Sequence, residues 1–363
     1  MGITTQRRAR APARLLDRAP MPDFPYINAR VRAMRSRLLD AGRMEELLGL
    51  PTPDAFLQAL GSTPYSRELQ EVLSHTHDGL RAVDEALARN FSLTTSRILS
   101  FADGKARELI ELVLMRWDLA NIRIILRAKH AGRHNDEILA NLIPAGRLNE
   151  PALKEVAGQS DVAGVVGALG GLDYPLALPL AEGLAAYRES GDLLGLELRL
   201  ERFYAAYGLR IAPGRGHDEQ VVRGLLQYQL DATNVKTAVK LQRVESLSRE
   251  DKLKFFIPGA RLTEYAFLEL TDRATAEQGL HAARVLGFPL RAALDDPAAF
   301  EREIDVALLR AQIALYLQDP LGIDVVIAYL AMKYNEVVNL RLIARGKALG
   351  IPRDRVRKEM AVV

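Results

Sequence analysis

A six-residue motif, Asp118-Leu119-Ala120-Asn121-Ile122-Arg123, returns as Asp231-Ala232-Thr233-Asn234-Val235-Lys236 and again as Glu336-Val337-Val338-Asn339-Leu340-Arg341. The first and second copies are 113 positions apart (234 − 121 = 113), and the second and third are 105 apart (339 − 234 = 105). Solenoid repeats span about 20–50 residues, so a period above 100 is the size of a small domain. The motif therefore predicts a domain present in three copies.

A second landmark supports the same period. Ile143-Pro144-Ala145-Gly146-Arg147-Leu148 matches Ile257-Pro258-Gly259-Ala260-Arg261-Leu262 at an offset of 114 (257 − 143 = 114). In the third copy Ile351-Pro352 comes only 12 residues after Asn339 (351 − 339 = 12), so we expect that copy to be truncated.

A fainter trace of the repeat lies upstream of the motif. Glu85, Glu197 and Glu303 recur at 112 and 106 positions (197 − 85 = 112, 303 − 197 = 106) in similar helical surroundings.

The composition describes an ordinary globular chain. Of 363 residues, 48% are hydrophobic and 26% charged, and the absence of cysteine excludes disulfides, thiolate metal sites and cysteine nucleophiles. No apolar run approaches the roughly 20 residues of a membrane helix. Residues 1–20 hold five arginines against one aspartate, so without them the net charge of +3 falls close to neutral. We interpret residues 1–20 as a basic, disordered tail and Met21 as the start of the protein.

Apolar residues recur at helical spacing through nearly the whole chain, and strand patterns are almost absent. We therefore predict an all-α fold of three similar helical domains, with boundaries at 21–150, 151–262 and 263–363. The long helices are expected over residues 27–48, 79–99, 105–131, 176–208, 218–243, 298–318 and 322–348.

On a helix with about 100° per residue, the repeated acid and Asn border the apolar face. We predict that they hold packing contacts in each domain, because a polar group at a core margin needs a hydrogen-bond partner. These packing residues are Asp118, Asn121, Asp231, Asn234, Glu336 and Asn339.

Two basic positions in each copy fall together on the opposite face of the helix. They form either a solvated surface or a ring of six cations that faces a partner, and the sequence leaves both interpretations open. These residues are Arg123, Arg127, Lys236, Lys240, Arg341 and Arg345.

The signatures of catalysis and of cofactor binding are missing. The chain has no phosphate-binding Gly-rich loop and no His-Glu-x-x-His pattern, and His130 and His134 lack a companion carboxylate on an unbroken helix. We predict no catalytic residue, no cofactor, no metal and no small-molecule substrate. Nucleic-acid binding is also disfavoured, because the arginines at 30–37 are followed directly by acids.

Three segments together resemble the C subunit of bacterial and archaeal V/A-type rotary ATPases, which is the relative of the d subunit of the eukaryotic vacuolar ATPase. They are Phe24 to Arg32, Asp118 to Lys129, and Gln318-Asp319-Pro320-Leu321-Gly322 through Asn339 to Pro352. The resemblance covers residues 22 to 361.

The resemblance implies a funnel of three helical domains around a pseudo-threefold axis. It further implies a non-catalytic subunit, one copy per complex, on the cytoplasmic face of the membrane. Its partners are then the D and F subunits of the shaft and the membrane rotor ring, and it passes torque between ATP chemistry and ion transport. The alternatives are a general helical scaffold and an RNA-binding helical protein.

Overall fold

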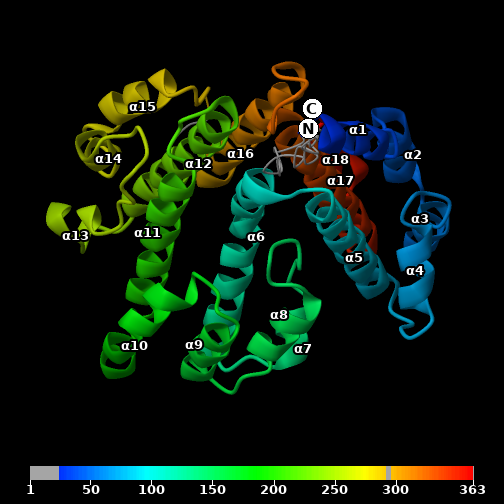
Figure 1. Ribbon diagram of the computed structural model, residues 1–363, viewed down its shortest axis with the longest axis horizontal. Helices are drawn as coiled ribbons and strands as arrows, with labels where there is room; N and C mark the ends of the chain where they lie inside the picture. Colours follow the sequence, from blue (N-terminus) through cyan, green and yellow to red (C-terminus); the bar gives the residue numbers. More distant parts are fainter. Residues whose placement is uncertain (1–23, 292–295, 363) are drawn as a thin grey trace, which may run out of the picture.

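The computed structural model describes residues 24–291 and 296–362, and every regular element in those ranges is a helix (Figure 1). The predicted all-α class is therefore confirmed. The basic tail at residues 1–20 and the proposed start at Met21 lie outside the described residues.

Three pairs of long consecutive helices form the frame of the molecule. In each pair a short connection joins the two helices, and the second helix carries one copy of the repeated motif. The pairs are α5 (Gly79–Ser100) with α6 (Gly104–His130), α11 (Leu193–Ile211) with α12 (His217–Leu241), and α16 (Pro297–Ala314) with α17 (Asp324–Ala348).

Short helices follow the first two pairs in the same order and spacing. After α6 come α7 (Asn135–Leu139), α8 (Glu150–Ala157) and α9 (Val162–Gly171); after α12 come α13 (Arg249–Leu253), α14 (Glu264–Leu270) and α15 (Ala276–Val285). Each member of the second set begins 114 residues after its counterpart (for α8 and α14, 264 − 150 = 114). Even the caps agree, because the side chains of Asn149 and Thr263 accept from the third backbone N–H beyond them.

The remaining helices lie at the start of each unit or at its end. The helix α4 (Ser66–Leu73) packs on α5, and α10 (Ala177–Ser190) packs on α11. The chain begins with α1 (Phe24–Arg35), α2 (Ala41–Gly49) and α3 (Pro53–Leu60); the 3₁₀ turn η1 (Leu315–Leu317) follows α16, and α18 (Arg353–Glu359) follows α17.

Two of the predicted long helices were wrong in their extent. The helix expected at 27–48 is interrupted between Arg35 and Ala41, where the side chain of Asp40 caps the start of α2. The helix expected at 176–208 is interrupted at Gly191, whose left-handed backbone (φ 68°) ends α10 and lets α11 fold back against it. Apolar spacing continues across both breaks, so periodicity alone did not reveal them.

The long helices also pack between successive units, and the third unit packs against the first. The helix α6 packs on α11, α12 packs on α16, and α17 packs on α5. One hydrophobic core joins α17 to the helices of the first half of the chain, and a second lies around the C-terminal part of α12 with α13–α16. The predicted boundary between the first two domains lies at residue 150. The helices α8 and α9 begin at that residue or after it, yet both pack on α6. The three domain boundaries stay predictions.

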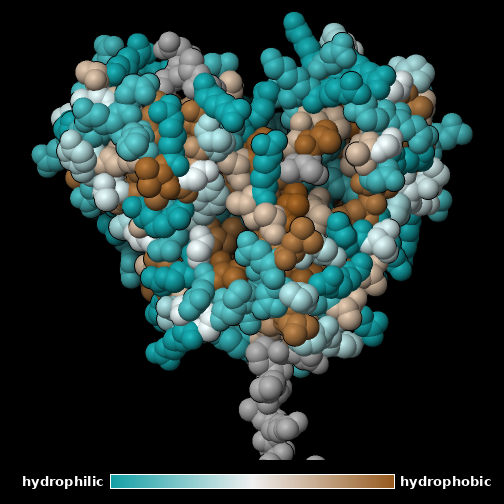
Figure 2. Space-filling model, turned by 90° about the horizontal axis from the view of Figure 1, so that it is seen from above, coloured by the Kyte–Doolittle hydropathy of each residue, from teal (hydrophilic) through white to brown (hydrophobic). Residues whose placement is uncertain are grey.

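Seen from above, the surface is mostly hydrophilic, and hydrophobic side chains show in the hollow between two lobes (Figure 2). Among the described helices, we find none with both the length and the apolar character needed to cross a membrane.

Candidate functional site

The repeated asparagine makes the same contact in all three copies. Asn121 donates to the carbonyl of Ile143 (2.7 Å) and accepts from its N–H (2.9 Å). Asn234 does the same with Ile257 (2.9 and 3.0 Å), and Asn339 with Ala361 (3.0 and 3.2 Å). Each asparagine thus satisfies both backbone groups of one residue 22 or 23 positions downstream.

The repeated acid holds the same downstream loop in the first two copies. The carboxylate of Asp118 accepts from the backbone N–H of Arg147 (2.8 Å) and of Leu148 (3.2 Å), and from the hydroxyl of Tyr174 (2.7 Å). Burial raises the pKa of Asp118 to about 6, although these three donors favour the charged form. A Cβ atom on Gly146 would collide with the Asp118 carboxylate, so the loop approaches this closely only because residue 146 is glycine.

Asp231 repeats this arrangement with an added charge. It accepts from the backbone N–H of Arg261 (2.9 Å) and of Leu262 (2.7 Å), and the Arg261 guanidinium lies 3.1 Å from its other oxygen. The two landmarks of the sequence are therefore two sides of one contact, a helix carboxylate and the loop that it holds.

The third copy replaces that loop with the N-terminal part of the chain. Glu336 accepts from the N–H of Leu39 (2.5 Å) and from the hydroxyl of Tyr65 (2.6 Å), and it pairs with Lys333 (2.8 Å). Burial raises the pKa of the Tyr65 hydroxyl and lowers the pKa of Lys333. The position equivalent to Ile143 is Ala361, at the same spacing of 22 residues, rather than Ile351.

All six packing residues are therefore buried, and their partners belong mainly to loop backbone or to the N-terminal segment rather than to neighbouring long helices.

The six basic residues all pair with carboxylates of the next unit in the chain, and the third unit pairs with the first. The pairs are Arg123 with Glu201, Arg127 with Glu197 (2.6 Å), Lys236 with Asp305 (2.8 Å), Lys240 with Glu301 (3.0 Å), and Arg341 and Arg345 both with Asp84 (3.3 and 3.1 Å). Each cation of a second long helix thus meets the first long helix of the following unit. Contact with a partner protein stays a prediction for these residues.

The acids that pair with these cations at the junctions between units are not the same set as the three acids that recur upstream of the motif in the sequence. Asp84, Glu197 and Glu301 hold the junctions, whereas Glu85 pairs with Arg89 (3.7 Å) and Glu303 accepts from the N–H of Arg291 (2.6 Å). All three acids of the faint trace lie on the first long helix of their units, but of these only Glu197 holds a junction.

A cavity of about 1020 Å³ lies where the second long helices approach one another, and we call it the central cavity. The position five residues before the repeated asparagine lines it in every copy, as Arg116, Gln229 and Tyr334. Three units therefore contribute equivalent positions to one space. The sequence comparison missed these residues because the three side chains share no chemistry.

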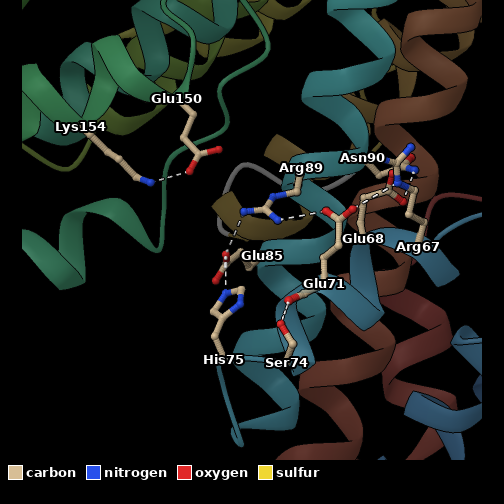
Figure 3. A network of polar contacts seen from close by, with 10 residues as sticks. All are labelled: Arg67, Glu68, Glu71, Ser74, His75, Glu85, Arg89, Asn90, Glu150 and Lys154. Carbon is tan, nitrogen blue, oxygen red and sulfur yellow. Dashed lines mark hydrogen bonds and ion pairs between the residues drawn. The ribbon is translucent and has the colours of Figure 1, made fainter.

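A second cavity, of about 520 Å³, lies between α5 and the short helices α7 and α8. Its walls carry a chain of paired charges, shown in Figure 3. Arg89 lies between Glu71 (3.4 Å) and Glu85 (3.7 Å), His75 lies 3.6 Å from Glu85, and on the facing helix Lys154 pairs with Glu150. These groups are therefore already paired with one another within the chain.

The N-terminal and C-terminal segments that resemble the ATPase family meet in the structure. The side-chain amide of Asn28 in α1 donates to the carbonyl oxygens of Pro320 (3.0 Å) and Gly322 (2.9 Å) in the turn before α17. On the other side of that turn, His217 lies 2.9 Å from the buried carboxylate of Asp324, which raises the pKa of His217.

The arginines at 30–37 lie largely against aromatic rings. Arg30 stacks over Tyr26 and Phe101, and Arg32 and Arg35 stack over Tyr316. His130 lies against the hydroxyl of Tyr187 (2.9 Å). In the part of the chain that the structure describes, no three His, Asp or Glu side chains gather as metal ligands.

Comparison with known proteins gives one consistent result. The family model for the ATP synthase (C/AC39) subunit matches residues 27–359. The C subunit of the V-type ATP synthase of Deinococcus radiodurans is 32% identical over 343 residues, covering 94% of this chain and 92% of that protein. The corresponding protein of Thermus thermophilus is 34% identical, covering 93% and 98%.

The similarity extends to archaea. The C subunit of the A-type ATP synthase of Methanocaldococcus jannaschii is 26% identical over 352 residues, covering 94% of this chain and 86% of that protein. The resemblance noted in the sequence is confirmed. The contacts of the repeated asparagine and acid, the junction ion pairs and the central cavity are features of a chain that belongs to the C-subunit family of V/A-type ATP synthases.

Proposed function

We propose that this chain is a non-catalytic rotor subunit that couples the central shaft, made of the D and F subunits, to the membrane rotor ring. It acts as one copy per complex, bound peripherally at the cytoplasmic face of the membrane. In this role it transmits torque for ATP-linked proton or sodium transport and holds no nucleotide or other cofactor.

The central cavity is the observation that carries this proposal. Equivalent positions of three units, Arg116, Gln229 and Tyr334, line one space of about 1020 Å³. A space surrounded by helices of three units suits the end of a rod-shaped partner better than a flat docking face would. The pseudo-threefold funnel that the family resemblance implies would have this space on its axis.

Torque transmission also requires units that do not slip past one another. The six basic residues act first as ties between units, because each already has a carboxylate partner in the next unit. Glu197 and Asp84 have largely buried side chains, and ion pairs with a desolvated carboxylate resist separation more than exposed pairs do. Such ties would let a force on one unit load all three.

Site-directed cross-linking offers a sharp test because the chain has no cysteine. Val338→Cys adds a single thiol at the central cavity, and Ala186→Cys adds one on the exposed surface of α10. Membranes carrying the intact ATPase are treated with a short thiol-reactive, photoactivated cross-linker, and the products are identified by mass spectrometry. We expect shaft subunits from the cavity thiol and none from the α10 thiol.

A companion pull-down uses the tagged full-length chain from detergent-solubilised membranes. Both the shaft and the ring subunits should co-purify with it. Recovery of neither would favour the general-scaffold alternative, and steeply salt-dependent recovery of RNA would favour the RNA-binding one.

A further inference from the structure

Arg116 holds a special place among the residues that line the central cavity. It lies on α6, and its guanidinium carbon is 4.2 Å from the ring centroid of Trp117 and 5.7 Å from that of Tyr334. Its Nη1 donates to the side-chain oxygen of Gln312 (3.3 Å). Two aromatic rings and a neutral amide therefore surround this cation.

The other charges of the central cavity are already paired within the chain. Its four carboxylates each have a cation partner: Glu201 with Arg123, Asp305 with Lys236, Glu301 with Lys240, and Glu359 with Arg302. No carboxylate among the described residues lies within 4.0 Å of the Arg116 guanidinium. Among the described residues that line the cavity, Arg116 is thus the one cation without a carboxylate in direct contact, and Asp305 acts on it only from a longer distance.

A guanidinium withdrawn from water is costly unless a charged partner compensates it. Burial lowers the pKa of Arg116, which reflects this cost. Cation–π contacts and one neutral hydrogen bond offset part of it, but a planar guanidinium can still make a two-pronged bond with a carboxylate. The chemistry of this position therefore calls for an incoming carboxylate.

The position also breaks the similarity of the three units. Its equivalents are Gln229 and Tyr334, so one of the three equivalent positions is charged and two are neutral. A partner that carries an acid at one side of its tip would meet Arg116 in only one of three orientations, each related by about a third of a turn.

We propose that Arg116 forms an ion pair with a carboxylate of the shaft end seated in the central cavity, and that this pair selects the shaft's rotational orientation. The inference rests on the proposed function, since it assumes that the shaft enters this cavity. It adds the residue that recognises the shaft and the chemical group recognised.

The test measures binding of the purified shaft complex of the D and F subunits to the full chain. Arg116→Gln should weaken binding by about 10- to 100-fold, as expected for loss of a desolvated charged pair, and Arg116→Lys should weaken it less. Arg67→Gln is the matched control, because neither this arginine nor its ion-pair partner Glu71 lines the cavity and its side chain is 82% exposed; the affinity of this variant should stay at the wild-type value. Circular dichroism and thermal melting confirm that each variant is folded.

Orientation is tested separately with the Val338→Cys thiol. The double variant Arg116→Gln, Gln229→Arg moves the cation to the equivalent position of the second unit. The cross-link from residue 338 should then move to a different face of the shaft. An unchanged cross-link would overturn the orientation role.

The outcomes separate the two proposals. If the wild-type chain binds the shaft and Arg116→Gln binds it equally well, the inference fails while the proposed function stands. If the wild-type chain does not bind the shaft at all, the proposed function fails and the inference fails with it. A saturable change in Trp117 fluorescence with acetate alone, lost in Arg116→Gln, would reassign the site to a free anion and overturn the shaft contact.

Discussion

The repeated asparagine permits a quantitative prediction, because its two hydrogen bonds to one backbone residue can be removed together. Asn234 is fully buried, and it satisfies both the N–H and the carbonyl of Ile257, which is itself 2% exposed. Leucine has a similar size but no polar atom, so Asn234→Leu leaves both groups unpaired. Each unpaired group costs about 1–3 kcal/mol. The apolar surface gained returns roughly 1–2 kcal/mol, so the net loss in free energy of unfolding is about 3 kcal/mol.

The same change at the other two copies provides matched comparisons. Asn121→Leu should cost about as much as Asn234→Leu, since Asn121 is also buried and holds its loop residue at similar distances. Asn339→Leu should cost only about 1 kcal/mol, because its partner Ala361 is half-buried and the next residue is exposed, so water can replace the lost bonds.

Urea unfolding measures these differences. Two probes are needed, because a chain of this size can unfold in steps: far-UV circular dichroism for the whole chain, and the fluorescence of Trp117, the only tryptophan. A loss below about 1 kcal/mol for Asn234→Leu, or equal losses at Asn234 and Asn339, would refute the reasoning from buried backbone groups.

Three further predictions concern the acid, its loop and the closing junction. The folded-state pKa of Asp118 is raised to about 6 from an ordinary 3.8, so its contribution to the free energy of unfolding is fully present below pH 3.8 and is lost as the pH rises through 6. Urea titrations of the wild-type protein should show the free energy of unfolding falling by roughly 3 kcal/mol across this range, and Asp118→Asn should remove that fall. Parallel pH curves for the two proteins would contradict this prediction. Gly146→Ala should lower the free energy of unfolding by about 2–4 kcal/mol because its methyl meets the Asp118 carboxylate, whereas Gly167→Ala, in open space on α9, should raise it by about 0.5 kcal/mol; equal effects would rule out the steric account. Asp84→Asn should cost about 2 kcal/mol, against less than about 1 kcal/mol for the exposed cation change Lys240→Gln, and the reverse order would disprove the importance of the closing junction.

The sequence predicted the all-α class and the repeated unit because both leave periodic traces. Both sides of the acid–loop contact, Asp118 and Arg147-Leu148, were also visible as repeated motifs, but the sequence did not show that they contact each other. The donors are backbone N–H groups, which any residue except proline supplies, so only the shared offset of the two landmarks hinted at the contact.

The junction acids show where register limits such reasoning. Asp84 and Glu85 are adjacent in sequence, yet a step of one residue turns a side chain by about 100° on a helix. Which of them meets α17 depends on the angle at which two helices pack, and that angle is set by residues far away in the chain. Arg116 lay beyond prediction for a different reason, since its equivalents Gln229 and Tyr334 retain its place but not its chemistry.

The pairing of Glu336 with the N-terminal segment has a consequence for synthesis on the ribosome. The N–H of Leu39 finds its acceptor 297 residues later in the chain. At about 5–20 residues per second, α1 and the linker after it wait roughly 15–60 s for α17 to emerge. The buried face of α1, with Phe24, Ile27 and Val31, is exposed throughout this interval. The earliest part of the nascent chain is thus among the last to be covered, and we expect it to be the segment that chaperones bind.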